Sequence, residues 1–340
     1  MLQVMVVDDS AFMRRVVSDI LNSDPELRVV ATARNGQEAL EQLDTISVDV
    51  ITLDVEMPHM NGLDFLRELM TRRPLPVVML SSLTMANSQT TLEALSLGAV
   101  DFVAKPGSYL GMDAQDLKVE LISKVKAAAL AKVFARPPRP CPPQVCPPSP
   151  GRLSTIVAIG ASTGGPRALE AVLAGLPGSL PAGLLITQHM PPGFTTSFAQ
   201  RLDRSSSLKV REAQEGDTLR HGTALIAPGD YHLLFGSGGR VRLNQGERVE
   251  YVRPSVDVMV DSIVQSFRGR LVGVIMTGMG RDGARGMEAI KARGGYVIAQ
   301  DEATSTIFSM PRAVIEAGLA DEILPLEEIA PAITRVVRGE

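Results

Sequence analysis

Short apolar runs alternate with amphipathic stretches through the first 133 residues of the chain. Apolar runs that end in polar residues are typical of buried parallel strands, and stretches with helical spacing are typical of helices packed on a sheet. With right-handed crossovers, five such strand–helix units predict a five-stranded doubly wound sheet. The predicted strands are 2–10, 27–33, 48–57, 76–82 and 101–107, and the predicted helices are 11–23, 36–44, 62–72, 88–98 and 114–133.

The same alternation returns after residue 153. Residues 230–251 depart from this pattern. Short runs of alternating apolar and polar residues lie there between glycines and predict a short β-meander. The whole chain is therefore predicted to be an α/β protein with two doubly wound domains, the second a mainly parallel, Rossmann-like sheet with a β-meander. Its predicted strands are 154–162, 182–190, 224–229, 270–280 and 295–300, and its predicted helices are 167–176, 254–267 and 281–293.

A proline-rich segment separates the two halves. Residues 136–150 hold eight prolines in fifteen positions, and proline is excluded from helix interiors and central strands. We expect a first domain at 1–124, a helix end and linker at 125–151, and a second domain at 152–340. Cys141 and Cys146 lie in this linker, where two thiols do not complete a zinc site, and we assign them no role.

Composition and charge exclude several classes of function. Residues 1–136 carry 13 Lys and Arg against 18 Asp and Glu, and residues 151–340 carry 20 against 20, so neither half offers a basic surface for nucleic acid. No apolar run reaches the ~18 residues that span a bilayer, and two aspartates follow the first apolar run too early for a secretion signal. We expect a cytoplasmic protein with no nucleic-acid partner and no membrane insertion.

Polar residues gather where the predicted strands of the first domain end. Asp8 and Asp9 end the first strand, Asp54 ends the third, Ser81 ends the fourth and Lys105 lies toward the end of the fifth. These ends share one edge of a parallel sheet, where such folds bind ligands. Converging carboxylates repel one another unless a hard divalent cation joins them, and oxygen ligands suit Mg²⁺. The edge is therefore predicted to accept and hold a phosphoryl group.

The motifs at this edge resemble those of two-component receiver domains. The resemblance covers residues 1–124 and rests on "VMVVDDS", "ITLDVEMPHMNGLDFL", "VVMLSS" and "DFVAKP". It implies a phosphoacceptor at Asp54 and a phosphoryl-binding lysine at Lys105. It also implies a Mg²⁺ site at Asp8, Asp9 and Asp54, with Ser81 and Phe102 at the switch hydroxyl and switch aromatic positions.

The stretch "VAIGASTGGP" in the second domain has two interpretations. Gly160, Ser162 and Gly164 match the G-x-S-x-G of a nucleophilic serine on a strand-to-helix turn. A small-residue loop after a strand is also typical of phosphate-binding turns, but this loop lacks the lysine of a P-loop and the glycine spacing of a dinucleotide-binding loop. The nucleophile interpretation is the stronger one, and it requires a base and an orienting acid.

Candidates for these two roles come from the ends of neighbouring predicted strands. His189 lies at the end of the strand beginning at 182, where the chain turns into a loop, and Asp282 follows the strand beginning at 270. A turn histidine and a helix N-cap are the plain structural alternatives for these two residues. The other histidines are His59, His221 and His232, and the other acids after the serine include Asp203, Asp217, Asp230, Asp257, Asp261 and Asp301.

From residue 153 onward the chain resembles the catalytic domain of the chemotaxis protein-glutamate methylesterases, the CheB family. The motifs are "AIGASTGGPRAL", "ITQHMPPGFTTSFAQRLD", "VREAQEGD", "IAPGDYHL", "PSVDVM", "VIMTGMGRDGARG" and "AQDEATSTIFSMPRAVIEAG". The resemblance implies Ser162 as nucleophile, His189 as general base and Asp282 as its orienter. It also implies oxyanion donors at Thr163 and Met279, in small-residue loops that let a substrate helix approach.

This resemblance implies an enzyme that hydrolyses glutamate methyl esters on chemoreceptors and deamidates receptor glutamines. Its partners would be methylated chemoreceptors, through their cytoplasmic helical region, and a chemotaxis histidine kinase that phosphorylates Asp54. The receiver would need Mg²⁺, and the esterase reaction would need no cofactor. Two other classes remain open at this point: a noncatalytic regulator that binds a partner through the same loop, and a DNA-binding response regulator, which the neutral second domain disfavours.

Overall fold

The computed structural model describes residues 1–82, 84–105, 114–132 and 153–340. The chain divides into two compact units, Met1–Pro137 and Pro138–Glu340, each considered by itself. The predicted linker at 136–150, with Cys141 and Cys146, lies outside the described residues. Across the described ranges no helix is both long and apolar enough to cross a membrane.

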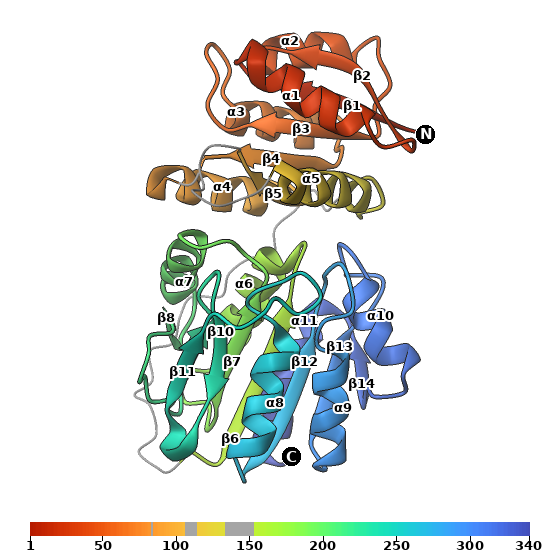
Figure 1. The fold of residues 1–340 in the computed structure, drawn as a ribbon. Coiled ribbons are helices and arrows are strands. Elements are labelled where there is room, and N and C mark those ends of the chain that lie inside the picture. Colours follow the sequence, from red (N-terminus) through yellow and green to blue (C-terminus); the bar gives the residue numbers. More distant parts are fainter. Residues whose placement is uncertain (83, 106–113, 133–152) are drawn as a thin grey trace. The chain divides into compact units, whose positions relative to one another are not determined.

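The first unit contains a five-stranded parallel sheet in the order β2-β1-β3-β4-β5 (Figure 1). All four neighbouring strand pairs are parallel, which confirms the predicted doubly wound fold. The central strands are buried on both faces, as their continuous apolar sequences predict. The strands are β1 (Leu2–Val7), β2 (Leu27–Ala33), β3 (Val50–Asp54), β4 (Val77–Ser81) and β5 (Asp101–Ala104).

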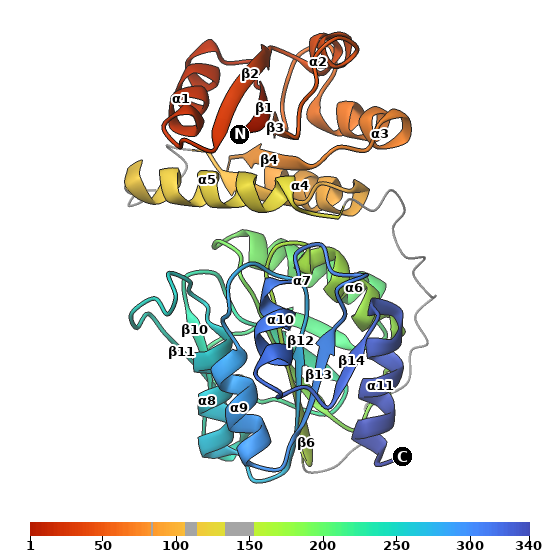
Figure 2. The same ribbon diagram turned by 90° about the vertical axis from the view of Figure 1, so that its right-hand side faces the viewer.

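Helices cover both faces of this sheet. Helix α1 packs beside α5, while α2, α3 and α4 pack in sequence on the other face (Figure 2). Four of the helices begin at a capping residue whose side chain accepts a backbone N–H of the first turn: Ser10, Asn35, Asn61 and Thr84. The helices are α1 (Ala11–Asn22), α2 (Gly36–Leu43), α3 (Gly62–Arg72), α4 (Met85–Leu97) and α5 (Ala114–Ala129).

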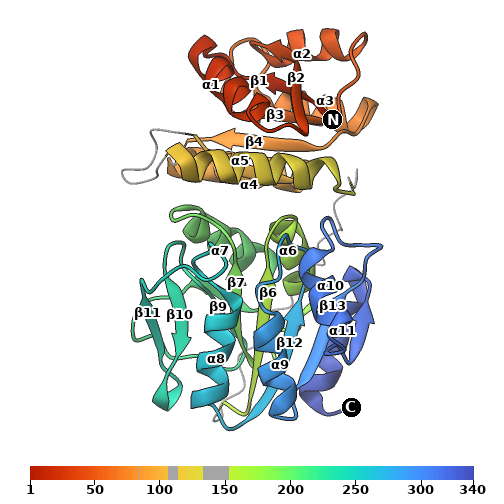
Figure 3. The same cartoon turned by 45° about the vertical axis from the view of Figure 1, so that its right-hand side comes forward.

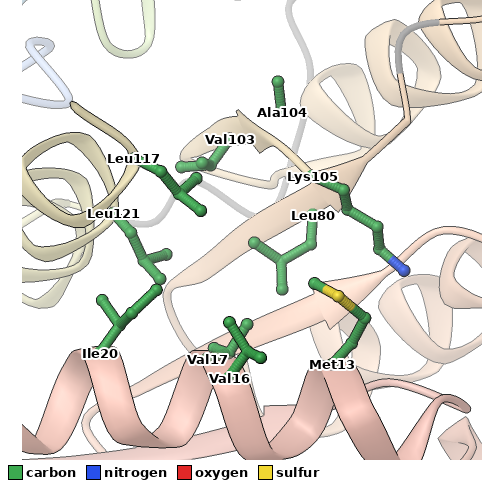
Figure 4. Close-up of a pocket in the computed structure, with 10 residues that line it drawn as sticks. All are labelled: Met13, Val16, Val17, Ile20, Leu80, Val103, Ala104, Lys105, Leu117 and Leu121. Carbon is green, nitrogen blue, oxygen red and sulfur yellow. The ribbon is translucent and has the colours of Figure 1, made fainter. Parts of the chain in front are cut away.

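A small cavity of about 10 Å³ lies in the apolar layer between α1, α5 and the sheet. Figure 4 shows Ile20, Leu117 and Leu121 at one end of it and Met13 and Lys105 at the other. The space is comparable to one water molecule, and its apolar lining offers no polar partners for one. The stem of Lys105 therefore lies against a dry apolar wall while its ammonium group reaches the polar edge of the sheet.

The second unit contains a seven-stranded sheet in the order β14-β13-β12-β6-β7-β9-β8, with every neighbouring pair parallel. The five predicted strands are its five central strands. Edge strands β8 and β14 were not predicted, because they are short and carry charged residues. The strands are β6 (Thr155–Ala161), β7 (Gly183–Gln188), β8 (Lys209–Glu212), β9 (Thr223–Ile226), β12 (Arg270–Ile275), β13 (Tyr296–Gln300) and β14 (Glu322–Leu324).

Two helical layers enclose this sheet. Helices α6, α7 and α11 pack together on one face, and α8, α9 and α10 pack on the other (Figure 2). Three of these helices, α7, α10 and α11, were not predicted from the sequence. The helices are α6 (Gly165–Gly175), α7 (Phe194–Ser205), α8 (Val256–Ser266), α9 (Ala284–Ala292), α10 (Ser309–Glu316) and α11 (Leu326–Arg338).

The segment predicted as a β-meander contains one antiparallel pair, β10 (His232–Phe235) and β11 (Val241–Asn244), joined through a single 3-10 turn at Ser237–Gly239. This hairpin lies beside α8 (Figure 3). The Phe235 ring meets the Phe267 ring edge to face, with centroids 5.8 Å apart. The segment is thus anchored to the main core of the second unit.

We expect Gly62→Ala to destabilise the first unit. A Cβ atom at Gly62 would lie 2.2 Å from the backbone oxygen of Asp54, so α3 would have to move away from β3. The expected loss is about 1–3 kcal/mol of unfolding free energy. Urea-dependent hydrogen exchange of β3 peptides measures it. Gly236→Ala, whose added Cβ comes no closer than 3.4 Å to any atom, is the control, and equal protection of β3 in both variants would contradict the expectation.

Candidate functional site

The acidic edge of the first unit assembles as the sequence predicts. The Lys105 ammonium lies 2.8 Å from Asp8 Oδ2 and 2.7 Å from Asp54 Oδ2, and both carboxyl groups are buried. Burial acts to lower the pKa of Lys105, but Asp54 and Asp8 outweigh it and raise that pKa. Lys105 is therefore a fixed positive charge between the two carboxylates.

One lysine does not neutralise this edge. Oxygen atoms of Asp8, Asp9 and Asp54 all lie within 4.8 Å of one another, and Asp9 is exposed to solvent. Burial raises the pKa of Asp54, and the charge of Asp8 raises it further against the opposing effect of Lys105. Three carboxylates with one ammonium fit a small divalent cation with oxygen ligands, such as Mg²⁺.

The two predicted switch residues lie deeper in the same unit. Ser81 is buried, and its Oγ lies 2.8 Å from Thr91 Oγ1, which also bonds the backbone oxygen of Asn87 at 2.7 Å. Phe102 is buried as well, and the Lys124 ammonium lies 5.2 Å from the centre of its ring. Thr91 joins Ser81 to α4, a contact that was not predicted from the sequence.

Three adjacent central strands of the second unit bring the other candidate residues together. Strands β6 and β7 pair so that their last residues, Ala161 and Gln188, face each other, and the next residues along the chain are Ser162 and His189. The His189 N–H donates to Ala161 O at 3.1 Å, and the Ser162 N–H donates to Thr277 O at 3.0 Å. Ser162 therefore lies at the carboxyl edge between the ends of β7 and β12.

His189 and Asp282 are in direct contact. His189 Nε2 lies 2.8 Å from Asp282 Oδ2, and both side chains are almost fully buried. With Nε2–H donating to the carboxylate, Nδ1 is the ring nitrogen left to accept a proton. The Ser162 hydroxyl makes no hydrogen bond within the described ranges, so the structure joins His189 to Asp282 and places Ser162 beside them without a bond. Such bonds often tighten only when substrate is bound.

Asp282 does not cap its own helix. Its carboxylate accepts four hydrogen bonds, and three of them come from the start of α8: Ser255 Oγ at 2.8 Å, the Val256 N–H at 2.7 Å and the Asp257 N–H at 3.1 Å. Burial acts to raise the pKa of Asp282, but His189 and these N–H groups outweigh it and lower that pKa. Asp282 is thus held as a carboxylate facing His189.

The two predicted oxyanion donors come from two different loops, those that follow β6 and β12. Thr163 is buried directly after Ser162, while Met279 is partly exposed in the loop that follows β12. In the part of the chain that the structure describes, the backbone N–H of Met279 makes no hydrogen bond. That N–H is available to an oxygen atom near Ser162.

Thr277 and Gln188 hold the loop around Ser162, and neither was predicted. Thr277 Oγ1 bonds the backbone oxygen of Thr163 at 2.9 Å, and the Thr277 N–H donates to Gln300 Oε1 at 2.8 Å. Gln188 Nε2 donates to the backbone oxygen of Ser162 at 2.9 Å. Gln188 ends β7 and Thr277 lies two residues after β12, and this position at a strand end was the only sequence signal that could have indicated them.

A second buried carboxylate lies beside Asp282. Asp257 Oδ1 accepts the N–H groups of Gly283 at 3.0 Å and Gly286 at 2.7 Å, and so fixes the start of α9. Burial, with the nearby Asp282 charge, raises the pKa of Asp257 to about 6 against the effect of those N–H groups. His232, not favoured as the base, is buried and accepts the Ser255 N–H through Nδ1 at 3.2 Å.

We expect Asp257→Asn to stabilise the protein above neutral pH. The folded chain binds a proton at Asp257 more tightly than the unfolded chain, whose ordinary carboxyl pKa is 3.8. Its titration therefore lowers stability as pH rises from about 4 to about 6. The variant removes this loss and keeps an amide oxygen for both N–H groups. At pH 8 its unfolding free energy should exceed wild type by about 1–3 kcal/mol, and the excess should shrink toward pH 4. Urea unfolding measures both values, and a pH-independent difference would contradict the assignment.

Two family models match the chain. The model described as response regulator receiver domain matches residues 4–112, and the model described as CheB methylesterase matches residues 157–333. The receiver match contains the residues of the acidic edge, and the methylesterase match contains Ser162 and the residues beside it.

Relatives similar to this chain share both parts. A protein-glutamate methylesterase/protein-glutamine glutaminase of Symbiobacterium thermophilum is 49% identical over 99% of this chain and 97% of its own length. One from Pyrococcus abyssi is 49% identical over 99% of this chain and 94% of its own. The crystal structure of the Thermotoga maritima CheB methylesterase catalytic domain is similar to this chain with a TM-score of 0.52 and 42% sequence identity. The match covers 55% of this chain and all of that domain. The chain therefore belongs to the CheB methylesterase family, with a response regulator receiver domain ahead of the methylesterase domain.

Proposed function

We propose that this protein hydrolyses the γ-methyl esters of glutamate side chains on chemoreceptors, and the amides of selected glutamines, at Ser162. The His189–Asp282 pair beside Ser162 is the observation that carries the proposal. The similar proteins named protein-glutamate methylesterase/protein-glutamine glutaminase support the substrate class. The cytoplasmic helical region of a methylated receptor is the proposed substrate, so the reaction takes place in the cytoplasm.

In the first half of the reaction, Ser162 Oγ attacks the ester carbonyl carbon while His189 Nδ1 takes the hydroxyl proton. The new C–O bond forms as the carbonyl π electrons move to oxygen. When the intermediate collapses, the bond to the methoxy group breaks and His189 returns the proton to departing methanol. Water then attacks the acyl-serine with the same base, which releases the glutamate carboxylate and restores Ser162. An amide substrate follows the same steps with ammonia leaving.

Asp282 and the two loop N–H groups contribute in different ways. Asp282 keeps a proton on His189 Nε2 and stabilises the imidazolium that forms, because its own charge is fixed by the α8 N–H groups. Thr163 and Met279 would direct their N–H groups at the developing oxyanion. Loss of one such donor typically costs ~10²–10³ in rate. No cofactor is needed for these steps.

We infer that residues 1–124 regulate residues 152–340 through phosphorylation of Asp54, with 125–151 connecting them. Asp8, Asp9 and Asp54 would hold a Mg²⁺ ion, which neutralises charge on an incoming phosphoryl group. The donor is the phosphorylated histidine of a chemotaxis histidine kinase: an Asp54 carboxylate oxygen attacks its phosphorus, the P–N bond breaks and the kinase histidine leaves. Lys105 pairs with a phosphoryl oxygen. Ser81 and Phe102 then respond to the new charge, as the switch positions of a receiver domain.

Ser162→Ala should abolish methanol release from methylated receptor membranes, by more than about 10³-fold, because the acyl-serine cannot form. His189→Ala should do nearly the same. Methanol release is measured by gas chromatography of the headspace, and the thermal unfolding midpoint of each variant is the control for folding. Methanol release at the wild-type rate by Ser162→Ala would rule out the nucleophile assignment and favour a noncatalytic role.

Asp54→Asn should remove the response to phosphorylation while leaving unstimulated methanol release in place. The reason is that the amide cannot accept a phosphoryl group, whereas the second unit retains its own site. The measurement is methanol release with and without kinase and ATP. Asp49→Asn, at an exposed aspartate of the same unit, is the matched control. If Asp54→Asn responds as wild type does, another residue accepts the phosphoryl group.

A further inference from the structure

A tight turn at residues 249–252, here called the tyrosine turn, stands at the end of the segment that leads into α8. Val249 and Val252 close it with two backbone hydrogen bonds, of 3.1 and 3.0 Å. Its central residues, Glu250 and Tyr251, have φ angles of 49° and 66°. Tyr251 is 92% exposed, the highest value among the exposed large hydrophobic residues of the described chain.

The turn holds a large side chain in an unfavourable backbone region. Left-handed φ angles cost an ordinary residue roughly 1–2 kcal/mol, and glycine or asparagine is the usual occupant. Tyr251 recovers none of this cost by packing, because its ring is in solvent. Exposed strain of this kind is a pointer to function, since no contact within the described protein accounts for the residue.

The base of the turn is firmly held. The Arg253 guanidinium donates to the backbone oxygens of Gln245 and Gly246, at 3.0 and 2.6 Å, and bonds Asp230 Oδ1 at 2.6 Å. His232 Nε2 donates to the backbone oxygen of Glu247 at 2.9 Å. The turn therefore presents Tyr251 from a fixed base, so little conformational entropy would be lost when a partner contacts the ring.

Tyr251 is also close to the proposed catalytic pair. Ser255 follows it by four residues, a chain length of at most about 14 Å, and Ser255 Oγ bonds Asp282. A helix rises about 11 Å in two turns, so one helical segment can reach both places. Met279 and Arg281 lie on the loop between β12 and Asp282 and are exposed, and Arg281 makes no ion pair within the described ranges.

We propose that Tyr251 is a docking residue for the protein segment that carries the esterified glutamate, one to two helical turns away from it. The proposal rests on the proposed function. The occupant is an acidic helical segment of the substrate protein: tyrosine supplies a rigid apolar and hydrogen-bonding contact, and the unpaired Arg281 complements carboxylates that flank the ester. Tyr251 takes no part in the chemistry and contributes to affinity for the protein substrate.

Tyr251→Gly separates docking from structure, because it should not destabilise the fold. Glycine accepts the left-handed φ without strain, so the midpoint of thermal unfolding should stay equal to wild type or rise. For methylated receptor membranes, kcat/KM should fall about tenfold because KM rises while kcat stays unchanged. For 4-nitrophenyl acetate, which is too small to reach the turn, the rate should stay within about twofold of wild type.

Two controls sharpen this test. Tyr251→Phe keeps the ring and should retain most of the receptor activity. Ile323→Ala alters a half-exposed apolar residue of β14 and should leave the activity on both substrates unchanged. Ser162→Ala, inactive on receptors if the proposed function is right, tests that function independently of Tyr251.

Three outcomes would overturn the docking role. An unchanged KM for receptors with Tyr251→Gly would show that the ring touches no substrate. An equal loss of activity on both substrates, together with a lower unfolding midpoint, would show a structural role. A change in oligomeric state by light scattering, with receptor KM unchanged, would assign the ring to contact between copies of this chain.

Discussion

A buried carboxylate is stable only when its charge is compensated, and Asp282 meets this demand with four hydrogen bonds. Three come from the first residues of α8 and one from His189. The loop after β12, the end of β7 and the start of α8 are therefore positioned by one anion. Removal of any one element would leave uncompensated charge, so the geometry of the proposed catalytic pair and the packing of the second unit depend on each other.

The acidic edge of the first unit shows the opposite solution to the same problem. There the carboxylates outnumber their positive partner, and the pKa of Asp54 is raised where that of Asp282 is lowered. Fully compensated charge suits an orienting residue, which must stay ionised and fixed. Undercompensated charge suits a site that takes up a cation and transfers a group. The direction of the two shifts thus agrees with the different roles proposed for these residues.

Fold and site were predictable from the sequence to different depths. The central strands were predicted because continuous apolar runs report burial on both faces, and parallel strand ends then brought Ser162 near His189. Edge strands β8 and β14 were not, since charged residues and three- or four-residue lengths leave no periodic signal. Partners such as Ser255 and Thr277 were missed because their bonds join residues 27 and 114 positions apart, a pairing that only tertiary structure determines. The roles of Ser162, His189, Asp282 and Asp54 remain predictions.

The glycines around Ser162 were interpreted as leaving room for an approaching substrate, and the structure favours another reason. A Cβ at Gly165 would lie 2.0 Å from Gln188 Oε1, and one at Gly278 would lie 2.8 Å from the Ser162 Cβ. The protein's own atoms, including the side chain that holds the Ser162 backbone, occupy the space that these glycines leave. They permit close packing beneath the serine, so its position is set by β7 and β12 before any substrate arrives. With the proposed function, substrate would reach the serine past the loops at this edge, where Met279 is partly exposed and Tyr251 lies in solvent.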